Sequence, residues 1–241
     1  RGTNYTVSVN GQDVLVTVVA GVVSVNIPDV GLVNLNTGQV TTGGQATSLS
    51  AALGDSATAA TTRNALQAAA AAVASLSESG TDGVSGATLD TVMQTISTAA
   101  TESNDEGLVA SVAAAAVTAA PSSATAIVRS AAKAAPNSAA SIVAASEAAL
   151  ASSQDAGAPE QNLLDAANDG IEDANAAADD GTPVIEDVTT DDVEEVVDEV
   201  EVPNDNVTVI ISATFTIRLS GGRFLTVTIN NENDDAVVAL A

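Results

Sequence analysis

The stretch that decides the fold is Leu108–Ala151, LVASVAAAAVTAAPSSATAIVRSAAKAAPNSAASIVAASEAALA. Pro121 and Pro136 divide it, 15 residues apart, and each begins the same pattern of proline, two polar residues, alanine and, three residues later, Ile-Val. Proline fits the first turn of a helix and disrupts its interior, so each one is expected to begin a new helix. We therefore predict short stacked helices, whose alanines allow axes at the low end of the usual ~8–10 Å spacing.

Helical spacing of apolar residues continues on both sides of this array, which defines an alanine-rich helical region over residues 48–178. Before the array, the spacing indicates one helix that ends near Gly80 and a second one after it. Their apolar positions are Leu66, Ala69, Ala70, Val73 and Leu76, then Leu89, Val92, Met93, Ile96 and Ala100. After the array, Pro159 is expected to begin a further helix through Leu163, Leu164, Ala167 and Ile171.

The N-terminal residues 1–47 have the period of two that is typical of half-buried strands. Strands are predicted over Asn4–Asn10, Val14–Val19, Val22–Ile27 and Leu32–Leu35, with Asn10-Gly11 as a tight hairpin turn. Four short strands with turn signals favour an antiparallel meander. The small polar residues 41–50 are predicted to be a linker to the helices.

Three motifs in this segment resemble FecR-type β domains. They are Arg1-Gly2-Thr3-Asn4-Tyr5-Thr6-Val7, then Val16-Thr17-Val18-Val19-Ala20-Gly21-Val22-Val23-Ser24-Val25, and finally Val33-Asn34-Leu35-Asn36-Thr37-Gly38-Gln39. The resemblance covers about the first 45 residues and implies an extracytoplasmic β domain. It also implies that the domain of the family begins before Arg1, so that one strand of it would be missing. FecR regulators carry signals from outer-membrane transporters, but this chain has no transmembrane helix and no cytoplasmic segment for that role.

Residues 179–205 form an acidic linker or helix. Between Asp155 and Asp205 lie 18 of the 31 acidic residues and no basic one. A valine stripe at Val193, Val196, Val197 and Val200 indicates a helix that begins near Thr189 or Thr190. Valine also suits strands, so a strand remains an alternative.

Residues 206–241 return to a period of two. A long strand is predicted from Val207 to Leu219, followed by a Gly221-Gly222 turn and a second strand, and then by the apolar tail Ala236–Ala241. The sequence thus predicts an α+β fold, in which an antiparallel β domain formed by the N- and C-terminal segments is interrupted by an alanine-rich α-helical insertion.

Charge and composition exclude several classes of function. The net charge of −25 opposes nucleic-acid binding, since that function needs a basic surface. The sequence contains no cysteine and no histidine, which excludes disulfides, thiolate or imidazole metal sites and Ser–His–Asp triads. We expect no enzyme and no cofactor, with calcium as the one open alternative.

Calcium prefers carboxylate oxygens, and its weak candidate ligands are Asp179, Asp180, Asp234 and Asp235. Asp165, Asp169 and Gly170 fit positions 1, 5 and 6 of an EF-hand, but Ala167 and Ala176 occupy positions 3 and 12, where ligands are required. A solvated acidic surface is the simpler interpretation of these residues.

The leading functional hypothesis is a structural subunit of an extracellular filament, sheath or surface assembly. Copies of the chain would form a homopolymer by β-strand exchange, in which a donated strand pairs with an open sheet edge. The expected interface residues are Ala236, Val237, Val238, Ala239 and Leu240 of the tail, or Val207, Val209 and Ile211 of the long strand. The alternative is a FecR-like sensing or ligand-binding module. Because the chain begins with Arg1, an N-terminal leader is expected to have been removed on export to the cell surface or beyond.

Overall fold

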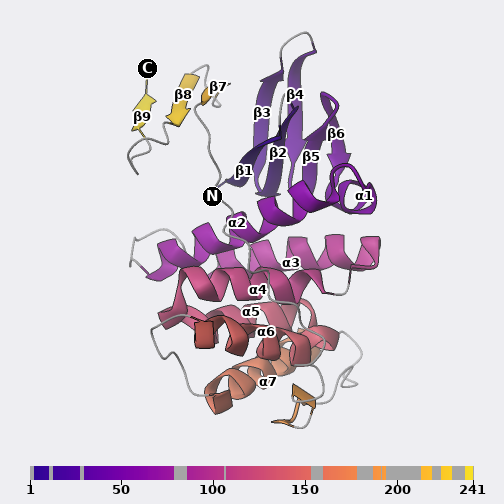
Figure 1. The fold of residues 1–241 in the computed structure, drawn as a ribbon, viewed down its shortest axis with the longest axis vertical. Helices are drawn as coiled ribbons and strands as arrows, with labels where there is room; N and C mark the ends of the chain where they lie inside the picture. The colour runs from indigo at the N-terminus through magenta and orange to yellow at the C-terminus, as the bar shows by residue number, and fades with distance from the viewer. Residues whose placement is uncertain are drawn as a thin grey trace.

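The structure, a computed structural model, describes residues 3–10, 13–27, 30–78, 86–105, 107–152, 160–177, 187–190, 192–193, 213–218, 224–229 and 237–240. Two layers of β-strands lie at one end of the molecule, and a stack of helices extends from them (Figure 1). The coarse α+β prediction is confirmed, because antiparallel N-terminal strands precede a helical region.

The N-terminal strands form two sheets. Their bounds are β1 Asn4–Asn10, β2 Asp13–Ala20, β3 Val22–Ile27, β4 Gly31–Asn36, β5 Gln39–Thr42 and β6 Gln45–Ser48. One sheet has the order β1-β2-β5-β6, while β3 and β4 form a separate antiparallel hairpin. The four expected strands are confirmed, but the simple meander is wrong, because the second neighbour of β2 is β5 and not β3.

The predicted linker over residues 41–50 is also wrong. It contains the end of β5, all of β6 and the start of helix α1, Leu49–Gly54. Gly43 and Gly44 have φ of 55° and 80°, which allows the tight turn between β5 and β6. Ser48 then caps α1 by accepting a hydrogen bond from the Ala51 backbone N–H at 3.2 Å.

Gly21 separates the two β layers. Its φ is 89°, and a Cβ atom there would lie 2.8 Å from Thr3 Oγ1, so a side chain would be both strained and obstructed. The chain turns at this point, and the β3–β4 hairpin packs over the face of the four-stranded sheet. The opposite face of that sheet packs on the helices through Leu15, Val19 and Val40.

The helices begin and end close to the predicted positions. Their bounds are α1 Leu49–Gly54, α2 Ala59–Glu78, α3 Gly86–Ser103, α4 Leu108–Ala119, α5 Ala124–Ala134, α6 Ala139–Ser152 and α7 Glu160–Ala177. Each array proline begins a 3-10 turn, Pro121–Ser123 or Pro136–Ser138, that leads directly into the next helix. Leu76, expected on the buried face of α2, is instead 45% exposed near the end of that helix.

The helices stack in two columns, because each one contacts the helix two places along the chain. One column is α1-α3-α5-α7 and the other is α2-α4-α6. The 15-residue period extends back to α4, since equivalent positions in α4, α5 and α6 are at most 2% exposed. These positions are Val109, Ala124 and Ala139; Val112, Ile127 and Ile142; Ala113, Val128 and Val143; Ala116, Ala131 and Ser146. The array is therefore a one-helix repeat whose apolar face is buried between neighbours.

The C-terminal strands form a third antiparallel sheet of order β7-β8-β9. Their bounds are β7 Ala213–Arg218, β8 Phe224–Ile229 and β9 Val237–Leu240. The predicted helix with a valine stripe is described only at its beginning. Thr190, Asp192 and Val193 are helical there, and the Val193 N–H donates to the Thr189 carbonyl at 3.3 Å.

Within the described ranges, no helix has the length and apolar character required to cross a bilayer.

Candidate functional site

The β end of the molecule carries a half-covered apolar layer between the four-stranded sheet and the β3–β4 hairpin. Its centre is buried: Val16 and Val18 of β2 pack against Val23 and Leu35 of the hairpin. At its margin, Tyr5, Val7, Val25 and Val33 are only partly buried. Partial burial still raises the pKa of the Tyr5 hydroxyl.

The position of the hairpin explains this margin. β3 and β4 both contact β2, and β4 also contacts β5 and β6, so the hairpin is centred over the middle of the sheet. β1 lies at the sheet edge and pairs with β2, with Tyr5 opposite Val18 and Val7 opposite Val16. A further strand beside β3 would lie above β1 and cover these two β1 side chains.

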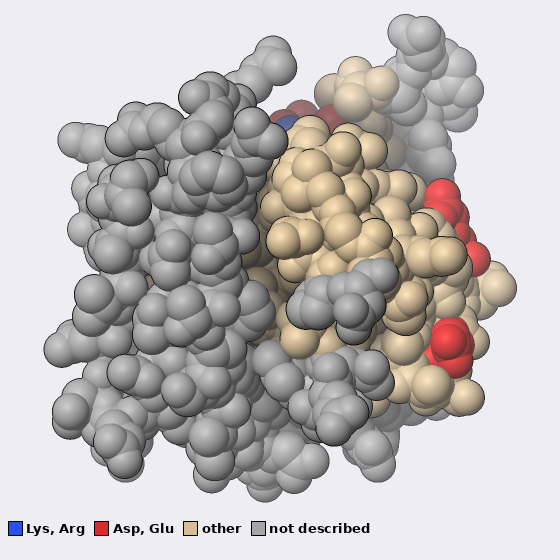
Figure 2. All heavy atoms as spheres, turned by 90° about the horizontal axis from the view of Figure 1, so that it is seen from above, with Lys and Arg blue, Asp and Glu red and all other residues tan. Residues whose placement is uncertain are grey.

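The strands at this end lack the usual protection against pairing with other chains. Natural edge strands are commonly blunted by charged residues or proline. In contrast, β1, β3, β4 and β6 contain neither a charged residue nor a proline. Val22, Val30 and Leu32 of the hairpin and its turn are 61%, 55% and 56% exposed, respectively. The described surface of this end is almost free of charge, and acidic groups lie at its margin (Figure 2).

The predicted interface residues fall partly within the described structure. Val237, Val238, Ala239 and Leu240 form β9, which pairs with β8 of the same chain. Ala236, Val207, Val209 and Ile211 lie outside the described residues. β7 approaches β3, with Cα atoms within 8 Å, but belongs to a different hydrogen-bonded sheet.

The calcium candidates Asp179, Asp180, Asp234 and Asp235 also lie outside the described residues. In the part of the chain that the structure does describe, no three acidic side chains form a group able to hold a metal ion. Asp165, Asp169 and Gly170 lie in the middle of α7, where a helical backbone cannot form the loop of an EF-hand.

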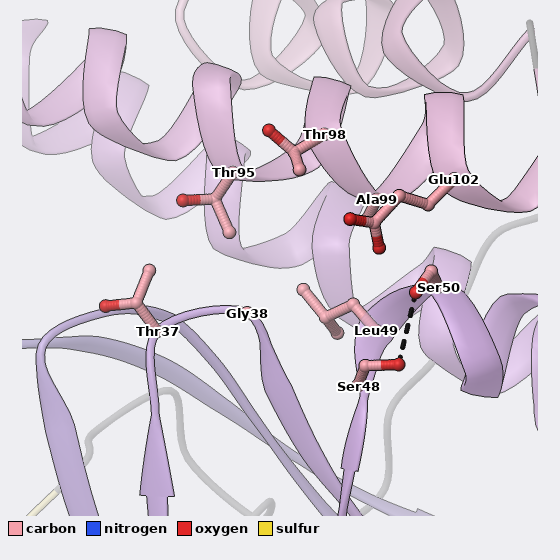
Figure 3. Close-up of a pocket in the computed structure, with 9 residues that line it drawn as sticks. All are labelled: Thr37, Gly38, Ser48, Leu49, Ser50, Thr95, Thr98, Ala99 and Glu102. Atoms are coloured by element: carbon pink, nitrogen blue, oxygen red, sulfur yellow. Dashed lines mark hydrogen bonds between the residues drawn. The ribbon is translucent and has the colours of Figure 1, made fainter.

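A second feature is a cleft of about 380 Å³ between the sheet and α3 (Figure 3). The turn between β4 and β5, the start of α1 and one face of α3 line it. The lining residues are Thr37, Gly38, Ser48, Leu49, Ser50, Thr95, Thr98, Ala99 and Glu102. Sequence reasoning missed this cleft, since its three walls come from separate segments and carry no motif.

The polar groups that line the cleft mainly offer hydrogen-bond acceptors to a ligand, because most of the lining hydroxyls donate their protons within the protein. Thr95 and Thr98 donate their hydroxyl protons to backbone carbonyls one turn earlier in α3, each at 2.9 Å. Thr37 donates to the Gly21 carbonyl at 3.2 Å, and Ser48 and Ser50 share one hydrogen bond at 3.1 Å. Among the described residues that line the cleft, Glu102 alone is charged, and its carboxylate points toward Leu49 and Ser50 (Figure 3). Such a cleft suits a cation with a small apolar body and does not suit an anion.

A third feature is a polar cluster that joins α3, α5 and α7. Ser130 on α5 donates to Asp90 Oδ1 at 2.5 Å, and Lys133 Nζ lies 3.4 Å from Asp90 Oδ2. Arg129 lies 3.0 Å from Asp173 and 3.9 Å from Asp169, both on α7. The hydrogen bond and the charge of Asp173 raise the pKa of Arg129. Ser130 donates its hydroxyl proton to a carboxylate and, as a residue, is only 7% exposed, so the cluster is better described as an interhelical clamp than as a nucleophile site.

The chain matches no known family, no curated protein and no solved structure. Function must therefore be argued from these three features alone.

Proposed function

We propose that the chain is a structural subunit of an extracellular filament, sheath or surface assembly, and that copies polymerise by β-strand exchange. The observation that supports this proposal is the half-covered sandwich beside β3, with its partly buried margin and uncharged edge strands. A strand added there would gain backbone hydrogen bonds from an open edge and would bury alternate side chains against Tyr5 and Val7.

In this proposal the donated strand is the segment 207–219, which contains β7. Apart from Ile210, its sequence alternates apolar and polar residues over 13 positions, longer than the ~5–6 residues of an average strand. The same segment, seated beside β3 within one chain, would complete the β domain from both ends of the sequence. The tail Ala236–Ala241 is the second candidate donor.

The first experiment compares particle mass by sedimentation and particle shape by electron microscopy, for the full chain in 10 mM and 500 mM NaCl. Salt is needed because copies carrying −25 each repel one another, and the screening length falls from about 30 Å at 10 mM to a few ångströms at 500 mM. Ordered polymers at high salt are expected. A uniform monomer at millimolar concentration and high salt would refute the proposal.

Matched variants on β3 test the location of the acceptor. Val25 faces the half-covered layer, whereas its neighbour Asn26 faces solvent on the same strand. Val25→Lys is expected to abolish polymers, because a charge would be buried when the strand docks, while Asn26→Lys should leave them intact. Both variants must have the melting temperature of the parent monomer, so that a loss of polymers cannot result from a loss of folding. Deletion of residues 236–241 distinguishes the two candidate donor strands. If assembly remains intact without these residues, the tail is not the donated strand.

The cleft favours a second candidate function, a FecR-like extracytoplasmic ligand-binding module. Its acceptor-rich walls and single carboxylate suit a small alkylammonium compound. Titration with n-butylammonium chloride, followed by NMR shifts of the Thr95 and Thr98 amides, should saturate for the parent chain and not for Glu102→Gln. Glu172→Gln, which removes an exposed carboxylate on α7, is the control. Equal shifts for all three chains would reject the site.

A further inference from the structure

The acidic segment after α7 is attached to the far end of the helical stack. Figure 1 places this short orange segment beside α7, at the end opposite the β layers. The name acidic strap is used here for its described residues, 187–190 and 192–193. The strap follows the last helix of the stack and precedes the C-terminal strands in the sequence.

Asn168 on α7 holds the strap by both groups of its side-chain amide. The Val188 backbone N–H donates to Asn168 Oδ1 at 2.8 Å, and Asn168 Nδ2 donates to the Val188 carbonyl at 3.1 Å. One amide thus replaces the pair of hydrogen bonds that a neighbouring strand would make with this residue. No sequence motif predicts this contact, because the two residues are 20 positions apart.

Two further contacts order the strap. Val193 is 3% exposed, and Val188 packs on the helical core beside it. Asp192 accepts hydrogen bonds from the Thr189 backbone N–H at 2.8 Å and from its hydroxyl at 2.6 Å, which caps the short helix that follows. The strap therefore has a small apolar anchor and a defined backbone, but little buried area.

Electrostatic repulsion opposes these contacts. α7 carries Glu160, Asp165, Asp169, Glu172 and Asp173, and the sequence from 178 to 205 adds twelve further acidic residues. The sequence has no basic residue between Lys133 and Arg218. The cations nearest to α7, Arg129 and Lys133, already pair with Asp90, Asp169 and Asp173. The repulsion between the strap and α7 therefore opposes the contacts of Asn168, Val188 and Val193, and dissolved salt weakens it by screening.

We infer that the acidic strap is an ionic-strength-dependent latch that limits the reach of the C-terminal strands, an inference that rests on the proposed strand exchange for its consequence. With the strap attached, 20 residue steps separate Val193 from Ala213, or at most about 70 Å of extended chain. With the strap released, 36 steps separate Ala177 from Ala213, and the reach rises to about 125 Å. The attached strap favours seating within one chain, and release favours donation to a second copy.

Hydrogen exchange of the full-length monomer tests the latch without any assembly. Between 300 mM and 10 mM NaCl, protection of the strap amides is expected to fall at least about tenfold, as the screening length rises from about 6 Å to about 30 Å. Asn168→Ala should remove this protection at both salt concentrations. Asn162→Ala, at an exposed position of α7, should behave like the parent chain, and α4 amides should stay protected in all three.

Salt-independent protection, or parent-like protection in Asn168→Ala, would overturn the latch, whether or not the chain polymerises. The consequence is tested separately by mixing monomers at 300 mM NaCl and measuring the rate of polymer growth. Asn168→Ala is expected to polymerise several-fold faster than Asn162→Ala, and equal rates would overturn the control of strand donation. Absence of polymers in all chains would refute strand exchange itself, but it would not affect the hydrogen-exchange test of the latch.

Discussion

Gly170 is the position where a single methyl group should disturb the helical stack most. It lies in the middle of α7, and a Cβ atom there would lie 2.5 Å from the Arg129 carbonyl oxygen and 2.9 Å from the Lys133 backbone nitrogen. Both atoms belong to the backbone of α5, so no rotamer change can move them away. In an exposed helix, replacing glycine by alanine stabilises by about 1 kcal/mol. Here we predict the opposite sign.

The magnitude follows from the displacement that α7 would need. Carbon–oxygen contacts in proteins are about 3.3–3.6 Å, so the two helices must separate by about 1 Å. Overpacking of this kind costs about 1–3 kcal/mol. The gap also weakens contacts of Leu163, Ala167 and Ile171, which are fully buried on the same helix. These lost contacts place the cost at the upper end of that range, about 3 kcal/mol, so after subtraction of the helix-propensity gain of about 1 kcal/mol Gly170→Ala should lose about 2 kcal/mol of unfolding free energy.

Urea denaturation and thermal melting measure this loss. For a chain of this size, about 2 kcal/mol corresponds to a Tm lower by roughly 5 °C. Gly54→Ala is the matched control, because Gly54 ends α1 and a Cβ atom there would meet nothing within 4 Å. The control should melt at or slightly above the temperature of the parent chain. If Gly170→Ala melts with the control, the close approach of α5 and α7 is refuted.

Three further predictions concern buried hydroxyls, a helix cap and an ion pair. Ser146 is fully buried without a hydrogen-bond partner and stands where the repeat has Ala116 and Ala131, so Ser146→Ala should raise the unfolding free energy by about 1 kcal/mol. Ser130→Ala removes a hydrogen-bond donor to Asp90 and should lower the unfolding free energy by a similar amount. Urea denaturation midpoints with unchanged slopes check both variants. Hydrogen bonds from Thr189 lower the pKa of Asp192 below 3.8. This helix cap therefore stabilises the folded chain above about pH 3.8, and its contribution is lost as the pH falls through the lowered pKa. An NMR titration that finds an ordinary aspartate pKa for Asp192 would contradict this prediction. Arg63 and Asp105, 2.7 Å apart and partly exposed, should show a double-mutant coupling of about 0.5–1 kcal/mol that decreases in 1 M NaCl, and a salt-independent coupling would argue against a screened ion pair.

Helix boundaries in the alanine-rich region could be predicted because proline and apolar spacing are local signals. Pro121 and Pro136 begin turns wherever the chain later packs, and Ile127 and Ile142 mark the buried face by their spacing alone. The 15-residue period extends to α4 without a proline, and there it becomes visible only from burial.

The features missed from the sequence depend on partners far along the chain. β5 and β6 have four residues each, too few for an alternating pattern, and they are strands because Val40 and its neighbours pair with β2 and with each other. Gly170 resembles a loop glycine in an acidic segment until α5 is placed against it. The half-covered sandwich likewise exists because β3 and β4 lie over β2, a placement that no local period specifies.

The division of charge along the chain bears on where copies can meet. Residues 1–54 contain only three charged side chains, Arg1, Asp13 and Asp29, whereas residues 55–178, which include the helices α2 to α7, contain 14 acidic and three basic residues and so carry a net charge of −11. Two copies that approach through their helical stacks would bring these acidic surfaces together, and the repulsion would be screened only at high salt. Two copies that approach through their β ends meet uncharged strands with exposed valine and leucine instead. If copies associate as proposed, the sequence therefore disfavours lateral contact of the stacks and leaves the open sheet edges as the surface with the least electrostatic repulsion.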